Sequence, residues 1–296
     1  SDVYKRQALL SMIFAGISVF TISAQSVTKE VTDGIRYCES TYPYEGGMLI
    51  ANFGTEQLNP LNSEGKGYIV WHKDGKNQVL IAADGHLSAP KGMWVHEGFL
   101  YVCDVNKVMV YNLKDKSAEP YTIQLPEGHL FANDVVVDGT YLYISVTNTD
   151  TIFRVDITRP SEPGTPEVWL SVPGPNGLLL YKGALYVASY PADGNTTDRN
   201  VVYRVADMKN PLPEKWVETP GQYDGLALAS DGKAIYLTNW APAQICRVDL
   251  ATREMKALDV DLAQPLVGPA DISVMDGCIY IPDLPNSRVV VVKETE

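Results

Sequence analysis

One sequence pattern recurs along almost the whole chain, and it restricts the fold more than any other feature. Each copy pairs a short apolar strand with a second strand of the form aliphatic-Tyr-aliphatic, and a turn that usually contains Gly joins the two. The first copy is weaker and has a leucine in place of the tyrosine. The central residues of the six copies follow one another at intervals of roughly 40 to 50 residues: Leu49, Tyr101, Tyr143, Tyr186, Tyr236 and Tyr280.

Turn and strand signals around each copy predict a four-stranded unit. Dipeptides such as Glu97-Gly98 and Asp138-Gly139 stand between the first two strands, where a tight hairpin needs them. A third β-rich run follows each hairpin, and several copies add a fourth, as at residues 167–170. Four strands in a repeat of this length are typical of a propeller blade. We therefore predict an all-β, six-bladed β-propeller with four-stranded antiparallel blades, and six copies in register argue against a β-sandwich.

The last copy is one strand short, because it ends with the run at residues 288–292. The segment at residues 27–31 is also β-rich, and it can supply the missing strand from the N-terminal side. Such a closure leaves no long unpaired strand edge in the ring. The sequence therefore predicts a single propeller domain over residues 25–296, closed by an N-terminal strand.

Residues 1–24 have the features of a secretory signal peptide. Two basic residues, Lys5 and Arg6, precede the apolar run 8–20, and small residues follow as far as Ala24. The run is shorter than the ~20 apolar residues of a membrane-spanning helix. We therefore expect cleavage after Ala24 and a periplasmic or secreted product with no membrane association. The four cysteines form no C-x-x-C pair, and their pairing stays open.

The charge balance excludes one class of partner. The chain carries a formal net charge of −12. Nucleic-acid binding needs basic patches that replace the counterions of the phosphates, so we expect no nucleic-acid partner. An acidic surface suits a neutral or cationic small molecule, or an anion whose charge is met by a metal, although solubility alone also explains it. Nothing in the sequence indicates an oligomeric state.

The residues at which the innermost strands begin are the candidates for chemistry, since these strands line the central channel of a propeller. In each copy one such position lies ten residues before the central residue. In the fifth copy a longer hairpin places it twelve residues before the central residue. Pseudosymmetry predicts that these positions lie at one level around the axis: Glu39, Lys91, Asn133, Asn176, Asp224 and Ala270.

Four of these six residues carry oxygen donors, namely two carboxylates and two amides. The set contains no His or Cys, and the four histidines of the chain show no ligand spacing. Oxygen ligands of this kind suit one divalent cation, with Ca²⁺ as the expected ion and Mg²⁺, Mn²⁺ or Zn²⁺ as alternatives. Polar strand starts that simply face a wet channel are the competing interpretation.

Four short motifs at these positions resemble those of the senescence-marker-protein/gluconolactonase family of regucalcin-like six-bladed propellers. The likeness extends over the whole of the predicted propeller domain, although each motif is short. The family motifs "PNGL", "PDG", "ND" and "ES" correspond to Pro175-Asn176-Gly177-Leu178, Tyr223-Asp224-Gly225, Asn133-Asp134 and Glu39-Ser40.

The resemblance implies a set of roles. Glu39, Asn176 and Asp224 would be the ligands of a single divalent metal. Asn133 would contact the substrate or a water on the metal, and Asp224 would also serve as the general base. The implied reaction is the hydrolysis of a lactone or a related ester, with Asp224 and Asn133 as the catalytic residues and a small molecule as the substrate.

The departures from the family pattern concern the substrate. Family lactonases often carry an Arg where this chain has Phe131, and a Pro where it has Tyr223. We predict that both aromatic residues, together with Lys91 and Asn133, contact the substrate, or else that the two aromatic residues pack in the core. A non-catalytic propeller that binds a protein or a glycan, similar to NHL-repeat proteins, is the alternative function. A strictosidine-synthase-like propeller is a third.

Overall fold

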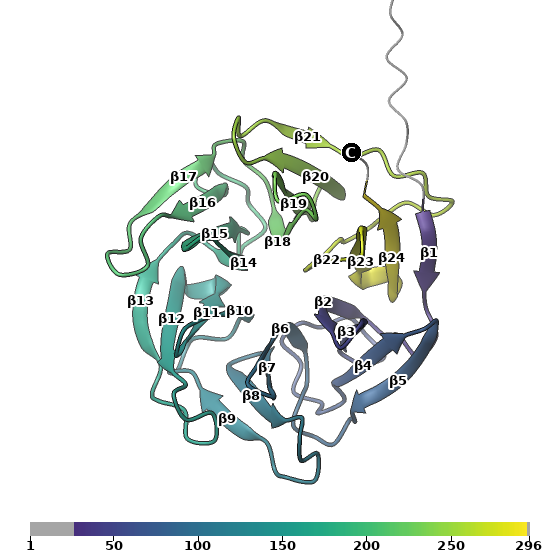
Figure 1. Ribbon diagram of the computed structural model, residues 1–296, viewed down its shortest axis with the longest axis vertical. Helices are drawn as coiled ribbons and strands as arrows, with labels where there is room; N and C mark the ends of the chain where they lie inside the picture. The colour runs from purple at the N-terminus through teal and green to yellow at the C-terminus, as the bar shows by residue number, and fades with distance from the viewer. Residues whose placement is uncertain (1–26, 295–296) are drawn as a thin grey trace, which may run out of the picture.

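Six four-stranded antiparallel sheets stand around a central axis, as Figure 1 shows for the computed structural model. The structure describes residues 27–294. The predicted all-β, six-bladed β-propeller is therefore confirmed. Within the described residues the only helical elements are two short 3₁₀ turns, η1 (Thr147–Thr149) and η2 (Leu284–Asn286), and no helix is long and apolar enough to span a membrane. The predicted signal segment lies outside the described residues.

The strands occupy equivalent places in each blade. The innermost strands are β2 (Cys38–Tyr44), β6 (Pro90–His96), β10 (Ala132–Asp138), β14 (Pro175–Tyr181), β18 (Tyr223–Leu228) and β22 (Ser273–Met275). The second strands are β3 (Gly47–Asn52), β7 (Phe99–Asp104), β11 (Tyr141–Val146), β15 (Ala184–Ser189), β19 (Ala234–Asn239) and β23 (Cys278–Asp283). The third strands are β4 (Tyr68–Lys73), β8 (Lys107–Asn112), β12 (Thr151–Asp156), β16 (Val202–Val205), β20 (Gln244–Asp249) and β24 (Arg288–Lys293). The outer strands are β5 (Lys76–Ile81), β9 (Tyr121–Gln124), β13 (Glu167–Ser171), β17 (Pro213–Val217), β21 (Met255–Ala257) and β1 (Val27–Val31).

The N-terminal strand closes the ring as predicted. β1 pairs antiparallel with β24, so that Val31 lies opposite Val289 in the last blade. Arg288 supports this closure, because its guanidinium is 2.9 Å from a carboxylate oxygen of Glu30 on β1 and also contacts Asp283. The sixth blade thus joins the two ends of the described chain, and β1 covers the outer edge of β24.

The repeated apolar positions account for the core. The second strand of each blade is almost entirely buried, and apolar side chains fill the space between neighbouring blades. One such cluster, for example, joins Tyr101 and Val110 of the second blade to Val135 and Phe153 of the third. The predicted hairpin at Glu97-Gly98 is present, with both residues at positive φ (51° and 85°). All four cysteines are free.

Candidate functional site

The structure brings five of the six predicted ring positions together in one cavity at the axis. Glu39, Lys91, Asn133, Asn176 and Asp224 all line it, whereas the buried Ala270 does not. The cavity encloses about 580 Å³ of empty space, counting its open mouth. Each of the five residues is the second residue of its innermost strand. The equal spacing along the sequence therefore corresponds to an equal place in space.

A local irregularity points these side chains at the axis. In each of the five blades the pairing between the innermost and the second strand shifts register within three residues of the strand start. In β14, for example, Pro175 pairs with Ser189 but the next paired residue is Leu178, and Asn176 lies in the shift between them. A bulge of this kind leaves a residue out of the ladder and redirects its side chain. The side chains of the ring thus turn away from the blade and into the cavity.

Glycine lets the innermost strands approach one another closely at this level. A Cβ added to Gly177 would stand 2.3 Å from the backbone oxygen of Asp224 in the next blade. A Cβ added to Gly225 would stand 2.6 Å from the Cα of Asp271. Both distances are too short for any side chain, so the glycines that follow Asn176 and Asp224 are required by the narrow ring.

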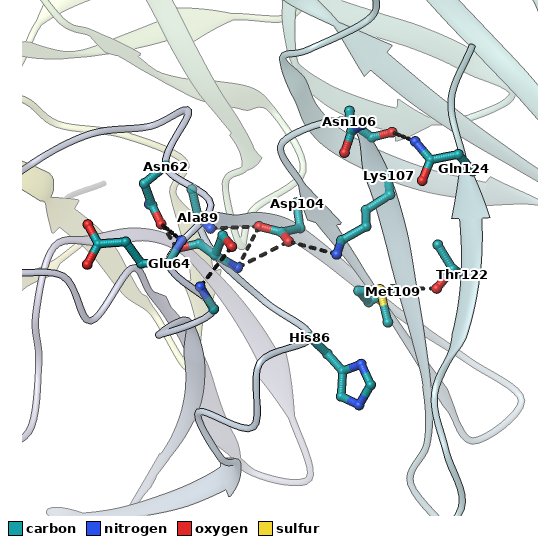
Figure 2. A network of polar contacts seen from close by, with 12 residues as sticks. Asn62, Glu64, His86, Ala89, Asp104, Asn106, Lys107, Met109, Thr122 and Gln124 are labelled. Carbon is teal, nitrogen blue, oxygen red and sulfur yellow. Dashed lines mark hydrogen bonds and ion pairs between the residues drawn. The ribbon is translucent and has the colours of Figure 1, made fainter. Parts of the chain in front are cut away.

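Carboxylate and amide groups at the ends of the second strands hold the loops that lead into the ring. These groups stand three residues after the central residue of a copy, and each accepts backbone N–H groups from the loop before its own innermost strand: Asn52, Asp104, Asn239 and Asp283. Figure 2 shows the second blade, where Asp104 accepts the N–H of Ala89 at 2.6 Å and lies 3.7 Å from Lys107. Ala89 is two residues before Lys91, so this contact places the ring residue. Sequence reasoning missed these anchors, although their fixed offset from the repeat was visible.

Four oxygens at the ring have no hydrogen-bond partner although they are buried. They belong to the four predicted oxygen-bearing residues, and we call this set the oxygen ring: Glu39 Oε2, Asn133 Oδ1, Asn176 Oδ1 and Asp224 Oδ1. The only other buried side-chain oxygens without a partner among the described residues are the hydroxyls of Tyr101 and Tyr111 in the core. Buried polar atoms are nearly always paired, so four unpaired oxygens lining one cavity indicate a ligand that supplies the partners.

The electrostatics of the oxygen ring point to a cationic ligand. Burial raises the pKa of Glu39 well above its usual range, and the nearby charge of Asp224 raises it further. Burial and the charge of Asp271 raise the pKa of Asp224 to about 8. The Asn176 amide opposes this shift through a weak hydrogen bond of 3.5 Å to Asp224 Oδ2. Two carboxylates that resist ionisation at close range become stable as anions when a cation stands between them.

The donor set fits a hard divalent cation. Carboxylate and amide oxygens are the usual ligands of Ca²⁺ and Mg²⁺, and an incomplete protein set leaves positions for water and substrate. Among residues 27–294 no group of three or more His, Cys, Asp or Glu side chains is arranged to hold a metal. The oxygen ring contains two such residues and completes its set with amides. It is therefore a site of mixed ligands, and which ion it binds stays a prediction.

A second layer of polar groups lies one residue further along the chain than the ring positions. Asp134 accepts the N–H groups of Val135 and of Leu178 in the next blade, both at 2.7 Å. Asp271 accepts the hydroxyl of Ser40 at 2.6 Å, which links the last blade to the first. Both aspartates line another cavity on the axis. Because their carboxylates have partners within the chain, this second layer (Ser40, Asp134 and Asp271) joins blades to one another.

The structure places the two predicted aromatic contacts differently. Phe131 lines the cavity, and its ring centroid is 5.2 Å from the ammonium nitrogen of Lys91. Tyr223 does not line the cavity. Its ring is buried between the fourth and fifth blades, and its hydroxyl donates to Thr219 O at 2.9 Å. Four cavity residues were not anticipated from the sequence, although each stands four residues after the central residue of its copy: Phe53, Tyr190, Trp240 and Leu284.

Comparisons with known proteins agree with the fold. A model of the LVIVD repeat matches residues 131–170, which correspond to the third blade. No curated protein matches the chain by sequence. The fold is similar to that of a Bacteroides thetaiotaomicron protein of unknown function, with a TM-score of 0.62 and 14% identity over 91% of this chain and 73% of that one.

Further solved structures share the architecture at low identity. A streptogramin B lyase has a TM-score of 0.59 and 15% identity over 90% of this chain and 97% of its own. A virginiamycin B lyase from Staphylococcus aureus, solved with quinupristin, has a TM-score of 0.58 and 13% identity over 90% and 99%. A nidogen/laminin complex gives a TM-score of 0.58 and 12% identity over 87% and 92%. At these identities the likeness shows the six-bladed propeller alone.

Proposed function

We propose that this protein is a divalent-cation-dependent hydrolase of a lactone or a related ester, acting in the axial cavity. The observation that carries the proposal is the oxygen ring, in which four buried oxygens from four blades lack partners. The motif resemblance to the senescence-marker-protein/gluconolactonase family supports the same positions independently. The divalent ion is proposed to be Ca²⁺, and a periplasmic or secreted location follows from the expected signal peptide.

The resemblance to the family motifs selects the proposed ligands among the four unpartnered oxygens. Glu39, Asn176 and Asp224 are proposed to hold the cation, in keeping with the family motifs. Asn133 Oδ1 is unpartnered in the same way, and its side chain is only 3% exposed. It therefore joins the same set of inward-facing oxygens, within reach of the cation or of a substrate oxygen beside it. A bound divalent cation polarises a carbonyl and lowers the pKa of water, which is the activation that ester hydrolysis requires.

The chain's own contribution is proton transfer, positioning and the exclusion of water. Asp224 is proposed to accept the proton of the attacking water on its carboxylate, to which the Asn176 amide also donates a weak hydrogen bond at Oδ2. A carboxylate with a pKa near 8 is mostly protonated at neutral pH, so Asp224 can act as a base only when a cation stabilises its anion. The apolar walls of the cavity, among them Phe131 and Trp240, limit the water that reaches the reacting carbonyl.

Another chemistry of the same fold is less well supported. The virginiamycin B lyase structure is of a variant made catalytically inactive by the replacement of a histidine. In this chain none of the four histidines lines the axial cavity, and His129 instead contacts Thr149 at 2.8 Å and packs against Phe153. We therefore do not extend a histidine-dependent lyase reaction to this protein.

Cation-dependent stability tests the proposal. Protein freed of metal with EDTA should gain thermal stability when Ca²⁺, Mg²⁺ or Mn²⁺ is added. At a hundredfold excess over Kd the gain is about 2.7 kcal/mol, which corresponds to about 5–10 °C for a chain of this size. Asp224→Ala should abolish the shift. Asp138→Ala, at an exposed hairpin turn, is the matched control and should retain it.

The outcome separates the two functions. If none of the three ions shifts the wild-type melting temperature, the hydrolase proposal fails, and the non-catalytic binding propeller becomes the better hypothesis. If an ion binds, aldonolactones and aryl esters should be assayed with Asp224→Asn as the control. We expect this variant to lose at least about 100-fold in kcat, because its amide cannot accept the proton.

A further inference from the structure

Lys91 is the one member of the ring positions that carries a positive charge, and its surroundings differ from those of a structural lysine. Its side chain is 1% exposed. Among the described residues it has no carboxylate within ion-pair distance, whereas buried charges are normally paired. Burial lowers the pKa of Lys91, and the acidic groups whose charges oppose this shift are, in order of effect, Glu39, Asp104 and Asp224. None of them contacts the ammonium directly, so its counter-charge is not supplied by a neighbouring side chain.

The hydrogen bonds of Lys91 leave one N–H donor of its ammonium group without an acceptor. An ammonium group has three N–H donors. Two of them are directed to the backbone carbonyls of Ala89 at 3.0 Å and Pro60 at 3.2 Å. The nitrogen also stands 5.5 Å from the centroid of Phe53 and 5.2 Å from that of Phe131, which favours the charged form through cation–π attraction. The third donor has no partner, and Lys91 lines the cavity.

The walls of the cavity around this donor are mainly aromatic and aliphatic. The lining residues that present rings or alkyl groups include Phe53, Pro60, Phe131, Tyr190, Trp240 and Leu284. The hydroxyl of Thr147, which also lines the cavity, is already engaged with Pro175 O at 2.9 Å. A sugar acid would need partners for several hydroxyl groups, whereas these walls match a flat apolar body.

The charges of the cation-loaded site favour a substrate that carries a negative charge. A divalent cation balances the two carboxylates of the oxygen ring, Glu39 and Asp224. Lys91 then remains beside them as a buried ammonium group with no carboxylate in contact. A substrate with one negative charge completes the balance, and a neutral substrate leaves Lys91 buried and unpaired.

We propose that the substrate class is a lactone or ester with a flat apolar body and one carboxylate group, and that Lys91 binds this carboxylate between Phe53 and Phe131. This inference rests on the proposed function for the reacting group, but the anion site itself depends only on Lys91 and the walls. Lys91 thus supplies the cationic contact in this cavity, where Phe131 itself contributes an aromatic ring.

A pair of isosteric probes tests the anion site without any reaction. Benzoate and benzamide have the same shape and differ in charge, and their binding to the Ca²⁺-loaded protein is measured by calorimetry. We expect benzoate to bind at least 10-fold more tightly than benzamide. Lys91→Met keeps the length of the side chain and removes its charge, so it should weaken benzoate at least 10-fold and leave benzamide unchanged. Phe131→Ala should weaken both probes by a similar factor.

The readouts separate this inference from the proposed function. A Ca²⁺-induced rise in the melting temperature of Lys91→Met shows that the variant is folded and that the oxygen ring is intact. Equal affinity of the wild type for the two probes overturns the inference, and so does unchanged benzoate binding in Lys91→Met, which would place the carboxylate elsewhere. If Ca²⁺ causes no shift in the wild type but benzoate still binds through Lys91, the hydrolase proposal fails and the anion site stands.

Discussion

Two adjacent layers at the axis are built from successive positions of the repeat, yet the hydrogen-bonding capacity of their side chains is satisfied to very different degrees. In the oxygen ring, Asn133 Oδ1 and Asp224 Oδ1 have no partner within the chain. One residue further along, Asp134 receives two backbone N–H groups and Asp271 receives the Ser40 hydroxyl. Both layers are buried, so exposure to solvent does not explain the difference.

The contrast separates side chains that stabilise the ring of blades from side chains whose hydrogen-bonding or coordinating partner would be a bound ligand. A buried carboxylate with hydrogen-bond donors repays part of the cost of its burial, whereas an unpaired one lowers stability until a partner arrives. The second layer therefore contributes to the fold, and the oxygen ring costs stability in the free protein. Proteins retain such a cost mainly at functional sites.

Replacing one aspartate from each layer should give the largest effect. Asp134→Ala leaves the buried N–H groups of Val135 and Leu178 without an acceptor, so we expect a loss of about 2–3 kcal/mol in the free energy of unfolding. Asp224→Ala removes a carboxylate whose Oδ1 has no partner and whose Oδ2 receives only the weak 3.5 Å hydrogen bond from Asn176, so it should leave the metal-free stability unchanged or raise it. Urea denaturation in EDTA measures both. Equal destabilisation by the two substitutions would remove the distinction between the layers.

The pH dependence of stability should come next in size. Burial raises the pKa of Asp271 from its usual value near 4 to about 7, against the opposing effect of the Ser40 hydroxyl. Between those two values the folded protein holds a proton that the unfolded chain has released. Stability therefore falls as the pH rises through this window, and the loss is complete above about pH 7. Asp224, with a pKa of about 8, acts in the same direction.

Asp271→Asn tests this dependence, because the amide stays neutral at every pH and can still accept the Ser40 hydroxyl. In EDTA at pH 8 the variant should exceed the wild type by at least about 1 kcal/mol. At pH 3, below both pKa values, Asp271 is protonated in the folded and the unfolded wild type alike, so the two proteins should differ little. Chemical denaturation at both pH values provides the measurement, and parallel pH profiles would show that Asp271 does not titrate during unfolding.

The repeat allowed the level of the ring to be predicted, but not which of its atoms are paired. Glu39 and Asn176 were found from their distance to Leu49 and Tyr186, because a strand advances by a fixed length per residue and the blades are equivalent. The partners of Asp134 could not be found in this way. Leu178 belongs to another blade, and its contact depends on how closely two innermost strands approach.

The repeat also does not indicate which way the two predicted aromatic residues face. Phe131 and Tyr223 both lie near a ring residue in sequence. Phe131 lies in the loop before β10 and faces the cavity, whereas Tyr223 is the first residue of β18 and pairs with Asn239. Side chains alternate along a strand, so the residue directly before Asp224 turns away from the axis and into the core between blades. The walls formed by Tyr190 and Trp240 stand at a fixed offset of the repeat, four residues after Tyr186 and Tyr236, so the repeat indicated their level but not that they face the cavity.

The anchors of the ring should show the smallest effect, and they test whether acceptor geometry or charge holds the ring residues in place. Asn52 and Asn239 perform with amide oxygens the task that Asp104 performs with a carboxylate. Asp104→Asn should therefore cost less than about 0.5 kcal/mol, whereas Asp104→Ala should cost about 1–2 kcal/mol because two loop N–H groups lose their acceptor. The ion pair with Lys107, at 3.7 Å, adds little at a partly exposed lysine. Urea denaturation measures the loss of stability in both variants. If Asp104→Asn loses as much stability as Asp104→Ala, the charge of the carboxylate beside the buried Lys91 matters more than the hydrogen-bond geometry that Asp104 shares with the anchors of the other blades.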